Sequence, residues 1–481
     1  MRRAKIVATF GPAVAGRART RALLAAGVDV ARLNMSHGDH RVHETTYLDI
    51  RAAAAELGRE VGVMADLQGP KIRLGRFLDG PHHLAVGDRF TITVRDVAGT
   101  PELCSTTFTG LPRDVRAGDA LLIDDGKVAL RAVEVTEHEV VTEVTVPGTV
   151  SDNKGINLPG VPVDVPALSD KDEADLRWAL RRGVDFIALS FVRDAADVDR
   201  VHEIMDEEGR RVPVIAKIEK PQAVAALERI VDAFDALMVA RGDLGVELPL
   251  EQVPIVQKRA IELARRWAKP VIVATQVLES MIDSPRPTRA EASDCANAVL
   301  DGADAVMLSG ETSVGAHPVG TVQTMARIIT STEAHGLERI PPLGSAPRTR
   351  GGAVTLGAVA IADQLGAHSI CTFTQTGDSA RRLSRLRPLR PVYAFTPARD
   401  VRNQLTLAWG VHPVLAPAPA HTDAMAAHID TALLGMELAA PADLVVMSAG
   451  SPPGVPGSTN LIKLHQIGDA SGRAADPSPG V

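Results

Sequence analysis

Short apolar runs rich in β-branched residues recur along the first two thirds of the chain, and helical patterns separate most of them. Stretches such as DKDEADLRWALRRG and VQKRAIELARRWAK place apolar residues at i, i+3 and i+4. Strands that alternate with helices form parallel sheets, so a count of eight indicates a (β/α)8 TIM barrel within the α/β class. A doubly wound open sheet is the alternative, because the number of strands does not prove closure. The eight runs cover residues 5–10, 29–36, 61–67, 185–192, 213–219, 236–243, 270–276 and 305–311.

The alternation is interrupted once, between the third and fourth runs, by a long segment with β patterns. It contains RFTITV, EVVTEVTV and the Asp-Gly turn of IDDGKV, which is typical of a hairpin. An insertion after a barrel strand lies over the face where such barrels carry their active sites, so the segment is predicted to be a lid. We assign residues 1–69 and 167–340 to the barrel and residues 70–166 to an inserted β-barrel lid domain.

A linker, RIPPLGSAPRTRGG, follows the eighth run and its helix. Four further apolar runs, in SICTFTQ, PVYAFT, HPVLAP and DLVVMSAG, are separated by helical patterns. This alternation predicts a second α/β unit, and we expect residues 341–481 to form a C-terminal α/β domain.

Composition excludes several classes of protein. A chain of 481 residues is long enough for two to four domains, and its net charge of −7 argues against a nucleic-acid partner. Three scattered cysteines, Cys104, Cys295 and Cys371, do not make a disulfide framework or a cysteine-rich metal site, and they suit a reducing compartment. No apolar run approaches the length of a membrane span. We therefore expect a cytoplasmic protein with no membrane partner.

Polar side chains collect where the predicted barrel strands end. Several form i, i+2 pairs, which project to the same side of a strand. Because active sites of such barrels lie at the carboxyl ends of the strands, convergence from seven strands indicates a site rather than solvated strand ends. The residues are Arg32, Asn34, Ser36, Asp66, Ser190, Lys217, Glu219, Arg241, Asp243, Thr275, Ser309 and Glu311.

Two of these carboxylates, Glu219 and Asp243, end adjacent predicted strands, and Lys217 shares a face with Glu219. Few carboxylates without His or Cys nearby suit Mg²⁺ or Mn²⁺, although an ion pair with Lys217 is the structural alternative. The RGDLGVE stretch adds glycines before a helix start, where backbone N–H groups can bind an anion. With arginines and a lid, these features predict metal-assisted chemistry on a small anionic substrate, of the phosphoryl-transfer type.

Longer motifs resemble those of the pyruvate kinase family: RLNMSHG, DLQGPKIRLG, KIEKP, VARGDLGVE, ATQVLESM and PRPTRAEASDCANAVLDGADAVMLSGET. The similarity covers essentially the whole chain, including SDNKGINLPG in the insertion and the late PPGVPGSTN. It implies transfer of the phosphoryl group of phosphoenolpyruvate to ADP, a regulatory C-terminal domain and a homotetramer. A barrel lyase acting on pyruvate enolate would not need the lid or the third domain. A catalytically inactive effector-binding protein conflicts with the filled catalytic positions.

The resemblance implies a role for each matched residue. Glu219 and Asp243 would hold Mg²⁺, and charge on the phosphoryl group would be stabilised by Lys217, Arg32 and Arg73. The substrate carboxylate would bind the backbone N–H groups of Gly242 and Asp243 and the hydroxyl of Thr275. Thr275 also sits where the enolate is protonated, with Ser309 and Glu311 tuning the proton path. The nucleotide would approach Thr9, Pro12, Asn34 and His37, and the lid would bring in Asp125.

Lys71 stands where many pyruvate kinases carry a glutamate linked to bound K⁺. In those members the ion is held by residues matching Asn34, Ser36 and Asp66 and by the carbonyl at Leu67. Here the lysine has Leu67, Gln68 and Leu74 as companions, a combination that resembles bacterial members working without K⁺. A tethered ammonium can supply the charge of the ion without losing translational freedom on binding. We therefore expect K⁺ independence, with a solvated hinge lysine as the alternative.

The C-terminal domain carries TQTGDS at residues 374–379, between a predicted strand and a helix. A Thr/Ser/Gly-rich turn at a helix start can cradle a phosphate, although an ordinary loop has the same composition. The resemblance implies an allosteric sugar-phosphate or nucleotide effector, such as AMP, at Thr374, Gln375, Thr376, Gly377 and Ser379. Asp378 departs from a pure phosphate site, so the identity of the effector stays open.

Overall fold

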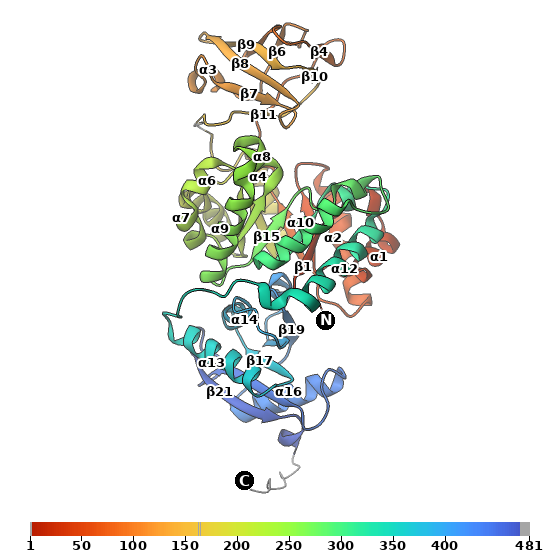
Figure 1. Ribbon diagram of the computed structural model, residues 1–481, viewed down its shortest axis with the longest axis vertical. Helices are drawn as coiled ribbons and strands as arrows, with labels where there is room; N and C mark the ends of the chain where they lie inside the picture. Colours follow the sequence, from red (N-terminus) through yellow and green to blue (C-terminus); the bar gives the residue numbers. More distant parts are fainter. Residues whose placement is uncertain (1, 162, 164, 472–481) are drawn as a thin grey trace.

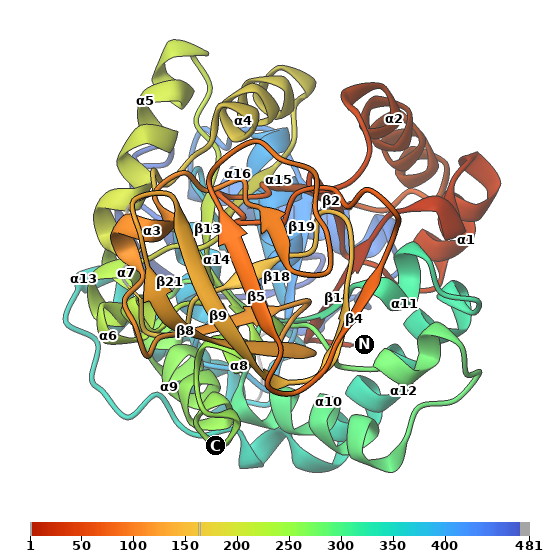
Figure 2. The same cartoon turned by 90° about the horizontal axis from the view of Figure 1, so that it is seen from above.

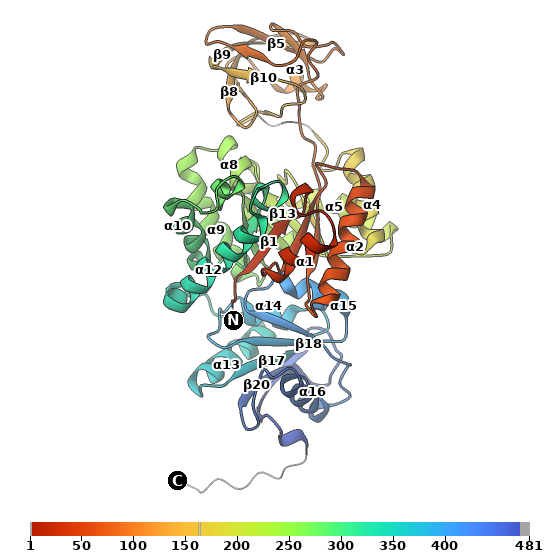
Figure 3. The ribbon, with the colours of Figure 1, turned by 90° about the vertical axis from the view of Figure 1, so that its right-hand side faces the viewer.

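The computed structural model describes residues 2–161, 163 and 165–471, and three parts follow one another along its long axis (Figure 1). A closed barrel lies in the middle, the inserted β-rich segment stands at one end, and an α/β part lies at the other end. The same order is visible from the side (Figure 3). The barrel therefore lies between the predicted lid and the C-terminal part.

The eight predicted runs form eight parallel strands that close into a barrel, which confirms the barrel over the open sheet. The last strand pairs with the first, with Ala8 opposite Leu308. β12 pairs directly with β3 across the long insertion, with Ala188 opposite Asp66. The strands are β1 (Lys5–Thr9), β2 (Val30–Asn34), β3 (Gly62–Asp66), β12 (Phe186–Leu189), β13 (Val214–Ile218), β14 (Ala236–Ala240), β15 (Val271–Ala274) and β16 (Ala305–Leu308).

Helices between the strands surround the barrel (Figure 2). The predicted helix DKDEADLRWALRR forms because Ser169 and Asp172 make a capping box at its start, and Gly183 ends it at φ 86°, which favours glycine. The helices are α1 (Arg17–Ala25), α2 (His40–Glu56), α4 (Asp170–Arg182), α5 (Asp199–Glu207), α6 (Pro221–Ala225), α7 (Leu227–Ala233), α8 (Arg241–Glu247), α9 (Val253–Arg266), α10 (Arg289–Asp301), α11 (Gly310–Ser313) and α12 (Pro318–Gly336).

The inserted segment, residues 70–166, is called the lid below. Its strands form a six-stranded sheet, β11-β7-β8-β9-β5-β6, and a two-stranded sheet of β4 and β10, rather than one closed barrel. The Asp-Gly turn joins β7 and β8 as the predicted antiparallel hairpin, with Ile123 opposite Val128. A separate apolar core around Phe90 and Leu121 holds the sheets together. The elements are β4 (His82–Leu84), β5 (Arg89–Thr93), β6 (Leu103–Ser105), α3 (Leu111–Asp114), β7 (Ala120–Ile123), β8 (Val128–Val135), β9 (Glu139–Val146), β10 (Gly148–Val150) and β11 (Ile156–Asn157).

The C-terminal part is a five-stranded sheet in the order β19-β18-β17-β20-β21 with helices around it. The four predicted strands are present, and a fifth, β21, pairs antiparallel with β20. β21 was not predicted, because its buried residues include the polar Thr459 and His465 and no apolar alternation results. The elements are α13 (Arg350–Gln364), β17 (Ser369–Phe373), α14 (Asp378–Ser384), β18 (Val392–Thr396), α15 (Arg399–Gln404), β19 (Val411–Leu415), α16 (Thr422–Gly435), β20 (Leu444–Gly450) and β21 (Thr459–Gln466).

The C-terminal part packs against the amino-terminal end of the barrel. Leu407 and Trp409 are fully buried within clusters of barrel residues. Arg387 forms an ion pair of 3.1 Å with Asp304, which precedes β16, and its guanidinium lies 5.0 Å from the centre of the Trp409 ring. This contact leaves the carboxyl ends of the barrel strands facing the lid.

The three cysteines are free and buried. Burial raises the pKa of the Cys104 thiol to about 11 and that of Cys295 to about 12, so both stay protonated at neutral pH. No helix in the described part of the chain is long and apolar enough to cross a membrane.

Candidate active site

Lys217 lies among residues from four neighbouring strand ends at the carboxyl end of the barrel. Its Nζ is 2.9 Å from Oε1 of Glu219 and 3.3 Å from Oδ1 of Asp66, and it donates a hydrogen bond of 2.7 Å to Oγ of Ser190. Arg32 donates from Nε to the second carboxylate oxygen of Asp66 at 2.6 Å. The structure therefore brings two predicted cations and two carboxylates into one buried cluster.

The charges of this cluster stabilise one another. Burial alone would lower the pKa of the Lys217 ammonium, but Asp66 and Glu219 raise it above its ordinary value. Burial alone would raise the pKa of Asp66, but Lys217 and Arg32 hold it below its ordinary value. Lys217 and Asp66 are therefore both charged at neutral pH, and the site presents fixed positive charge to an anionic substrate.

The predicted metal ligands, Glu219 and Asp243, lie after β13 and in the first turn of α8. Glu219 is almost fully buried, and its Oε2 accepts a hydrogen bond of 2.7 Å from the backbone N–H of Phe191. Burial raises the pKa of Glu219; Lys217 opposes this and the charge of Asp243 adds to it. A divalent cation between the two carboxylates would remove that repulsion, so the pair fits Mg²⁺ or Mn²⁺. Among the described residues, no group of three or more His, Cys, Asp or Glu side chains could hold a metal ion. Mg²⁺ usually keeps several waters and binds through one or two carboxylates together with oxygens of the substrate.

Gly242 and Thr275 meet beside this pair. The backbone N–H of Gly242 donates to Oγ1 of Thr275 at 2.7 Å, and a Cβ at Gly242 would lie 3.3 Å from the same oxygen. Thr275 has φ 68° and Gln276 has φ 54°, a conformation that costs free energy and is common at functional sites. Arg241 supports this turn by donating from Nη2 to the carbonyl oxygen of Thr275 at 2.9 Å. The strained turn presents a hydroxyl and an N–H group together.

Glu311 and Ser309 support the same loop from the end of β16. Glu311 is fully buried, and its carboxylate accepts hydrogen bonds from the backbone N–H groups of Ser309 at 2.6 Å and Leu278 at 3.3 Å. Leu278 lies three residues after Thr275, so the carboxylate holds the loop that carries the threonine. Glu311 thus acts on the site through the backbone.

The residues predicted on the nucleotide side lie at the ends of β1 and β2. Oγ1 of Thr9 accepts a hydrogen bond of 2.9 Å from Nη1 of Arg32, which links this side to the charged cluster. Pro12 begins a short 3-10 turn after β1. Burial lowers the pKa of His37, and the charges of Arg73, Arg32 and Lys71 lower it further. His37 therefore lies within the field of three cations that a polyphosphate could neutralise.

Three predicted residues belong to the lid, and this lid orientation does not bring them into the cluster. Arg73 donates from Nη1 to the carbonyl oxygen of Asn153 within the lid, at 3.0 Å. The side chain of Lys71 lies against the backbone of Gly155, because a Cβ added at Gly155 would be 3.0 Å from Cε of Lys71. Asp125 is exposed in the turn between β7 and β8, with φ 57°. Within the described part of the chain, no hydrogen bond or ion pair joins these three side chains to Asp66 or Lys217.

The residues of the predicted pocket for a monovalent cation already form hydrogen bonds and ion pairs within the protein. Oδ1 of Asn34 accepts from the backbone N–H of Ser36 at 3.2 Å. The carbonyl oxygen of Leu67 accepts from Oγ of Ser190 at 2.7 Å, and Asp66 is paired with Arg32 and Lys217. The negative charge of this pocket is therefore compensated by protein cations.

Sequence reasoning placed Ser190 and Arg241 at strand ends but gave neither a role. Ser190 bridges Lys217 and the carbonyl oxygen of Leu67, and Arg241 holds the strained turn at Thr275. The available signal was their position after buried strands, in LSF and VARGD.

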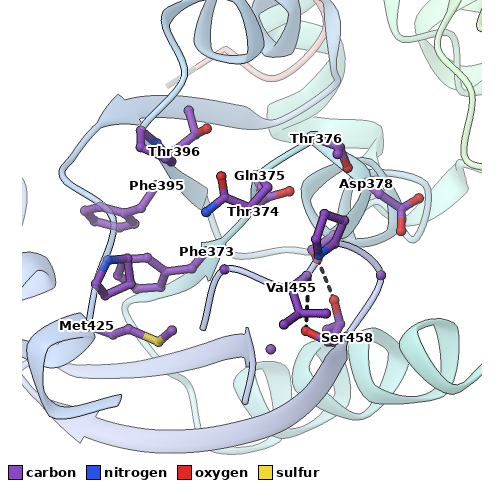
Figure 4. Close-up of a pocket in the computed structure, with 18 of the residues that line it drawn as sticks. Phe373, Thr374, Gln375, Thr376, Asp378, Phe395, Thr396, Met425, Val455 and Ser458 are labelled. Atoms are coloured by element: carbon purple, nitrogen blue, oxygen red, sulfur yellow. Dashed lines mark hydrogen bonds between the residues drawn. The ribbon is translucent and has the colours of Figure 1, made fainter. Parts of the chain in front are cut away.

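The predicted effector loop lines a pocket in the C-terminal part (Figure 4). Oγ1 of Thr374 accepts from the backbone N–H of Gly377 at 2.9 Å, and the hydroxyls of Ser379 and Thr459 are 2.6 Å apart. The pocket is partly open to solvent. Asp378 forms a 2.6 Å ion pair with Arg382. This pair compensates the negative charge that a pure phosphate site would not contain. Further lining residues are Phe373, Gln375, Thr376, Phe395, Thr396, Met425, Val455 and Ser458.

Comparisons with known proteins agree over almost the whole chain. Residues 1–322 match the family model described as pyruvate kinase, barrel domain, and residues 352–465 match pyruvate kinase, alpha/beta domain. The chain is 58% identical to the pyruvate kinase of Corynebacterium efficiens over 97% of this chain and 98% of that protein. It is 56% identical to the pyruvate kinase of Mycobacterium tuberculosis over 97% of this chain and 99% of that protein. A crystal structure of a pyruvate kinase from Cryptosporidium parvum superposes with a TM-score of 0.89 at 36% identity, covering 97% and 96% of the two chains.

Proposed function

The chain belongs to the pyruvate kinase family, and on this premise we propose that the cluster at the carboxyl end of its barrel transfers the phosphoryl group of phosphoenolpyruvate to ADP. The observation that carries this assignment is Lys217, a buried lysine fixed between Asp66 and Glu219 with Arg32 beside it. A cation held in place before the substrate binds stabilises transferred negative charge without reorganisation during the reaction.

Each part of the cluster has its own task in this proposal. Lys217 and Arg32 stabilise the charge of the phosphoryl group, and Arg73 joins them when the lid closes. Glu219 and Asp243 would hold Mg²⁺, or Mn²⁺ in its place. The ion they hold would act as a Lewis acid and offset negative charge on the substrate. The repulsion between the two carboxylates supports this assignment.

The substrate carboxylate binds at the strained turn. The N–H groups of Gly242 and Asp243 and the hydroxyl of Thr275 supply its donors, so the carboxylate replaces the internal contact between Gly242 and Thr275. The same hydroxyl lies where the methylene carbon of the enolate receives its proton. Glu311 keeps this hydroxyl in place through the backbone of its loop and of Ser309.

ADP approaches from the ends of β1 and β2, along Thr9, Pro12, Asn34 and His37, and the lid adds Asp125 when it closes. Closure also excludes water, which would otherwise accept the phosphoryl group. The field of Arg32, Lys71 and Arg73 at His37 supports an approach of the diphosphate on this side.

We further propose that the enzyme does not require K⁺. Asp66, which would hold the ion together with Asn34, Ser36 and the carbonyl of Leu67, already pairs with two protein cations. Lid closure carries the ammonium of Lys71 toward this pocket. We expect full activity without K⁺ and Na⁺, and a Lys71→Glu variant stimulated by K⁺. A rise of about tenfold in the kcat/KM of the wild type on adding K⁺, about 1.4 kcal/mol, contradicts this proposal.

A phosphorylated metabolite, either a sugar phosphate or AMP, is the proposed activator at residues 374–379. The hydroxyls of Thr374, Thr376 and Ser379, which line the pocket, and the ion pair of Asp378 with Arg382 support it. A panel of sugar phosphates and AMP at subsaturating phosphoenolpyruvate tests it. Activation by none of them contradicts the assignment of the loop.

A homotetramer in the cytoplasm is also proposed. Sedimentation at micromolar concentration tests the assembly, and a stable monomer contradicts it. The three buried, unpaired cysteines are compatible with a reducing compartment.

The assignment of the cluster is tested by initial rates with phosphoenolpyruvate and ADP in the presence of Mg²⁺. We expect Ser190→Ala to lower kcat about tenfold, because the Nζ of Lys217 loses a hydrogen-bond partner of 2.7 Å. The matched control is Ser293→Ala, a serine in α10 outside the cluster. Equal rates for wild type and Ser190→Ala contradict the proposed placement of Lys217.

A further inference from the structure

One side chain of the lid is bonded to the helix that carries the predicted substrate and metal groups. Nδ2 of Asn157, in β11, donates a hydrogen bond of 3.1 Å to Oε1 of Glu247, the last residue of α8. The two residues are 8% and 6% exposed. β11 lies at the base of the lid, above α8 (Figure 1). Across the described part of the chain, this is the one hydrogen bond between a lid side chain and a barrel side chain.

Glu247 connects Asn157 to both sides of the predicted metal site. The first turn of α8 carries Asp243, about one turn away from Glu247 along the same helix. The Oε1 atom of Glu247 also lies 2.6 Å from Nζ of Lys220, which directly follows Glu219 in the chain. The Lys220 ammonium lies 5.4 Å from the ring centre of Phe191, whose N–H binds Glu219.

Other contacts hold the two chain crossings between barrel and lid, not the lid sheet. The N–H of Gly69 donates to Asp172 at 3.0 Å, and Arg193 donates to the carbonyl oxygens of Val163 and Val165 at 3.0 Å and 2.7 Å. Asn157 belongs to the six-stranded sheet itself, where it lies opposite Leu122. Its bond to Glu247 therefore acts on the orientation of the whole sheet.

A cavity lies beside this contact, between the base of the lid and the barrel. It is partly open to solvent and is lined by Lys71, Asn157, Phe191, Arg193 and Lys220, together with apolar residues such as Ile72 and Leu158. Packing between the lid and the barrel is therefore incomplete beside this contact. The buried hydrogen bond between Asn157 and Glu247 is a direct polar connection at this boundary.

We propose that Asn157 is a positioning residue, which through Glu247 sets the lid relative to α8. The bond holds the base of the lid on α8, and the lid turns about this point when it closes and brings Arg73 and Asp125 over the two carboxylates. This inference rests on the proposed role of the lid in closure. Hydrogen bonds to charged groups are among the stronger ones in proteins, so this bond can bias such an orientation.

The test compares Asn157→Leu, which keeps the size but removes the donor, with Asn157→Asp, which sets a carboxylate against Glu247. The double variant Asn157→Asp/Glu247→Gln restores the pair with donor and acceptor exchanged. Thr145→Val is the matched control, because its hydroxyl donates to the carbonyl oxygen of Ala129 within the lid. Hydrogen–deuterium exchange of residues 241–247 and steady-state kinetics for ADP are measured on each folded protein.

We expect Asn157→Leu to lower kcat/KM for ADP about tenfold and to speed exchange in α8, with the affinity for phosphoenolpyruvate little changed. Asn157→Asp is expected to be more impaired, and the double variant to recover to within about threefold of wild type. Unchanged exchange in Asn157→Leu, or failure of the exchanged pair to recover, overturns the proposal. Faster exchange with unchanged kinetics also overturns it, since the contact would then be structural only. An inactive wild-type protein would instead count against the proposed function, because exchange does not depend on turnover.

Discussion

Replacing Lys217 by methionine tests the charged cluster most sharply, because methionine keeps the length of the side chain and removes its charge. Glu219 then loses a cation at 2.9 Å, whereas Asp66 keeps Arg32. At an effective dielectric constant near 20, the lost attraction is about 6 kcal/mol, offset by the cost of burying the ammonium. We expect the free energy of unfolding to fall by about 3 kcal/mol and kcat for phosphoryl transfer to fall about 10²–10³-fold.

Two reactions measured on the same Lys217→Met protein separate its roles. Pyruvate release with ADP reports phosphoryl transfer, and exchange of the methyl protons of pyruvate in D₂O, followed by NMR, reports only the proton step. We expect the exchange to be largely retained, because Thr275 and the metal ligands remain. Lys5→Met is the matched control, since Lys5 is a buried lysine at the opposite end of the barrel, bonded to the carbonyl oxygen of Val411 at 2.8 Å. Equal loss of both reactions in Lys217→Met would refute a separate phosphoryl role, and so would the same loss in Lys5→Met.

Three further results are expected. Glu219→Ala and Asp243→Ala should both remain folded by circular dichroism and lose binding of Mn²⁺ measured by calorimetry. Their kcat should fall about 10²-fold or more. A variant that keeps Mn²⁺ binding or the wild-type kcat contradicts the metal site. Thr374→Ala/Ser379→Ala should keep the rate at saturating substrate and lose activation by the phosphorylated effector; loss of the basal rate would assign the loop to folding. Burial lowers the pKa of His412 to about 3, so the unfolded chain binds a proton more readily from about pH 6.5 downward, and stability is lost as the pH falls. Relative to pH 7, protonation of His412 in the unfolded chain should lower the free energy of unfolding by about 1–2 kcal/mol at pH 5. The Tm of His412→Gln should therefore fall less as the pH is lowered, and equal pH profiles of the variant and the wild type contradict this.

The barrel was predictable because its strands are continuous apolar runs, buried on both faces and separated by amphipathic helices. Closure, confirmed by the pairing of β1 with β16, depends on contacts between residues about 300 positions apart, which no local pattern reports. The edge strand β21 was not predicted, because its buried positions are occupied by the polar residues Thr459 and His465, where an apolar side chain is expected.

The residues of the candidate site were predictable, because polar residues after buried strands differ clearly from the apolar sequence around them. Their pairing was not, since the contacts of Lys217 with Asp66 and Ser190 depend on the order of strands around the barrel. The placement of Lys71 beside Gly155 depends on the pairing of the two ends of the lid, where the N–H of Ile156 donates to the carbonyl oxygen of Ile72 at 2.9 Å, and no motif encodes this pairing. Asn157 and Glu247 are 90 positions apart, and each alone resembles an ordinary polar residue.

The central claim is that this chain moves a phosphoryl group from phosphoenolpyruvate to ADP with a metal ion held by Glu219 and Asp243. The most direct measurement follows pyruvate and ATP together, for the purified wild type with and without ADP and with and without Mg²⁺. The account predicts equal amounts of both products, formed only when ADP and the metal are present, and almost none with Asp243→Ala. Pyruvate formed without ADP, or no product from the folded wild type under any of these conditions, would contradict it.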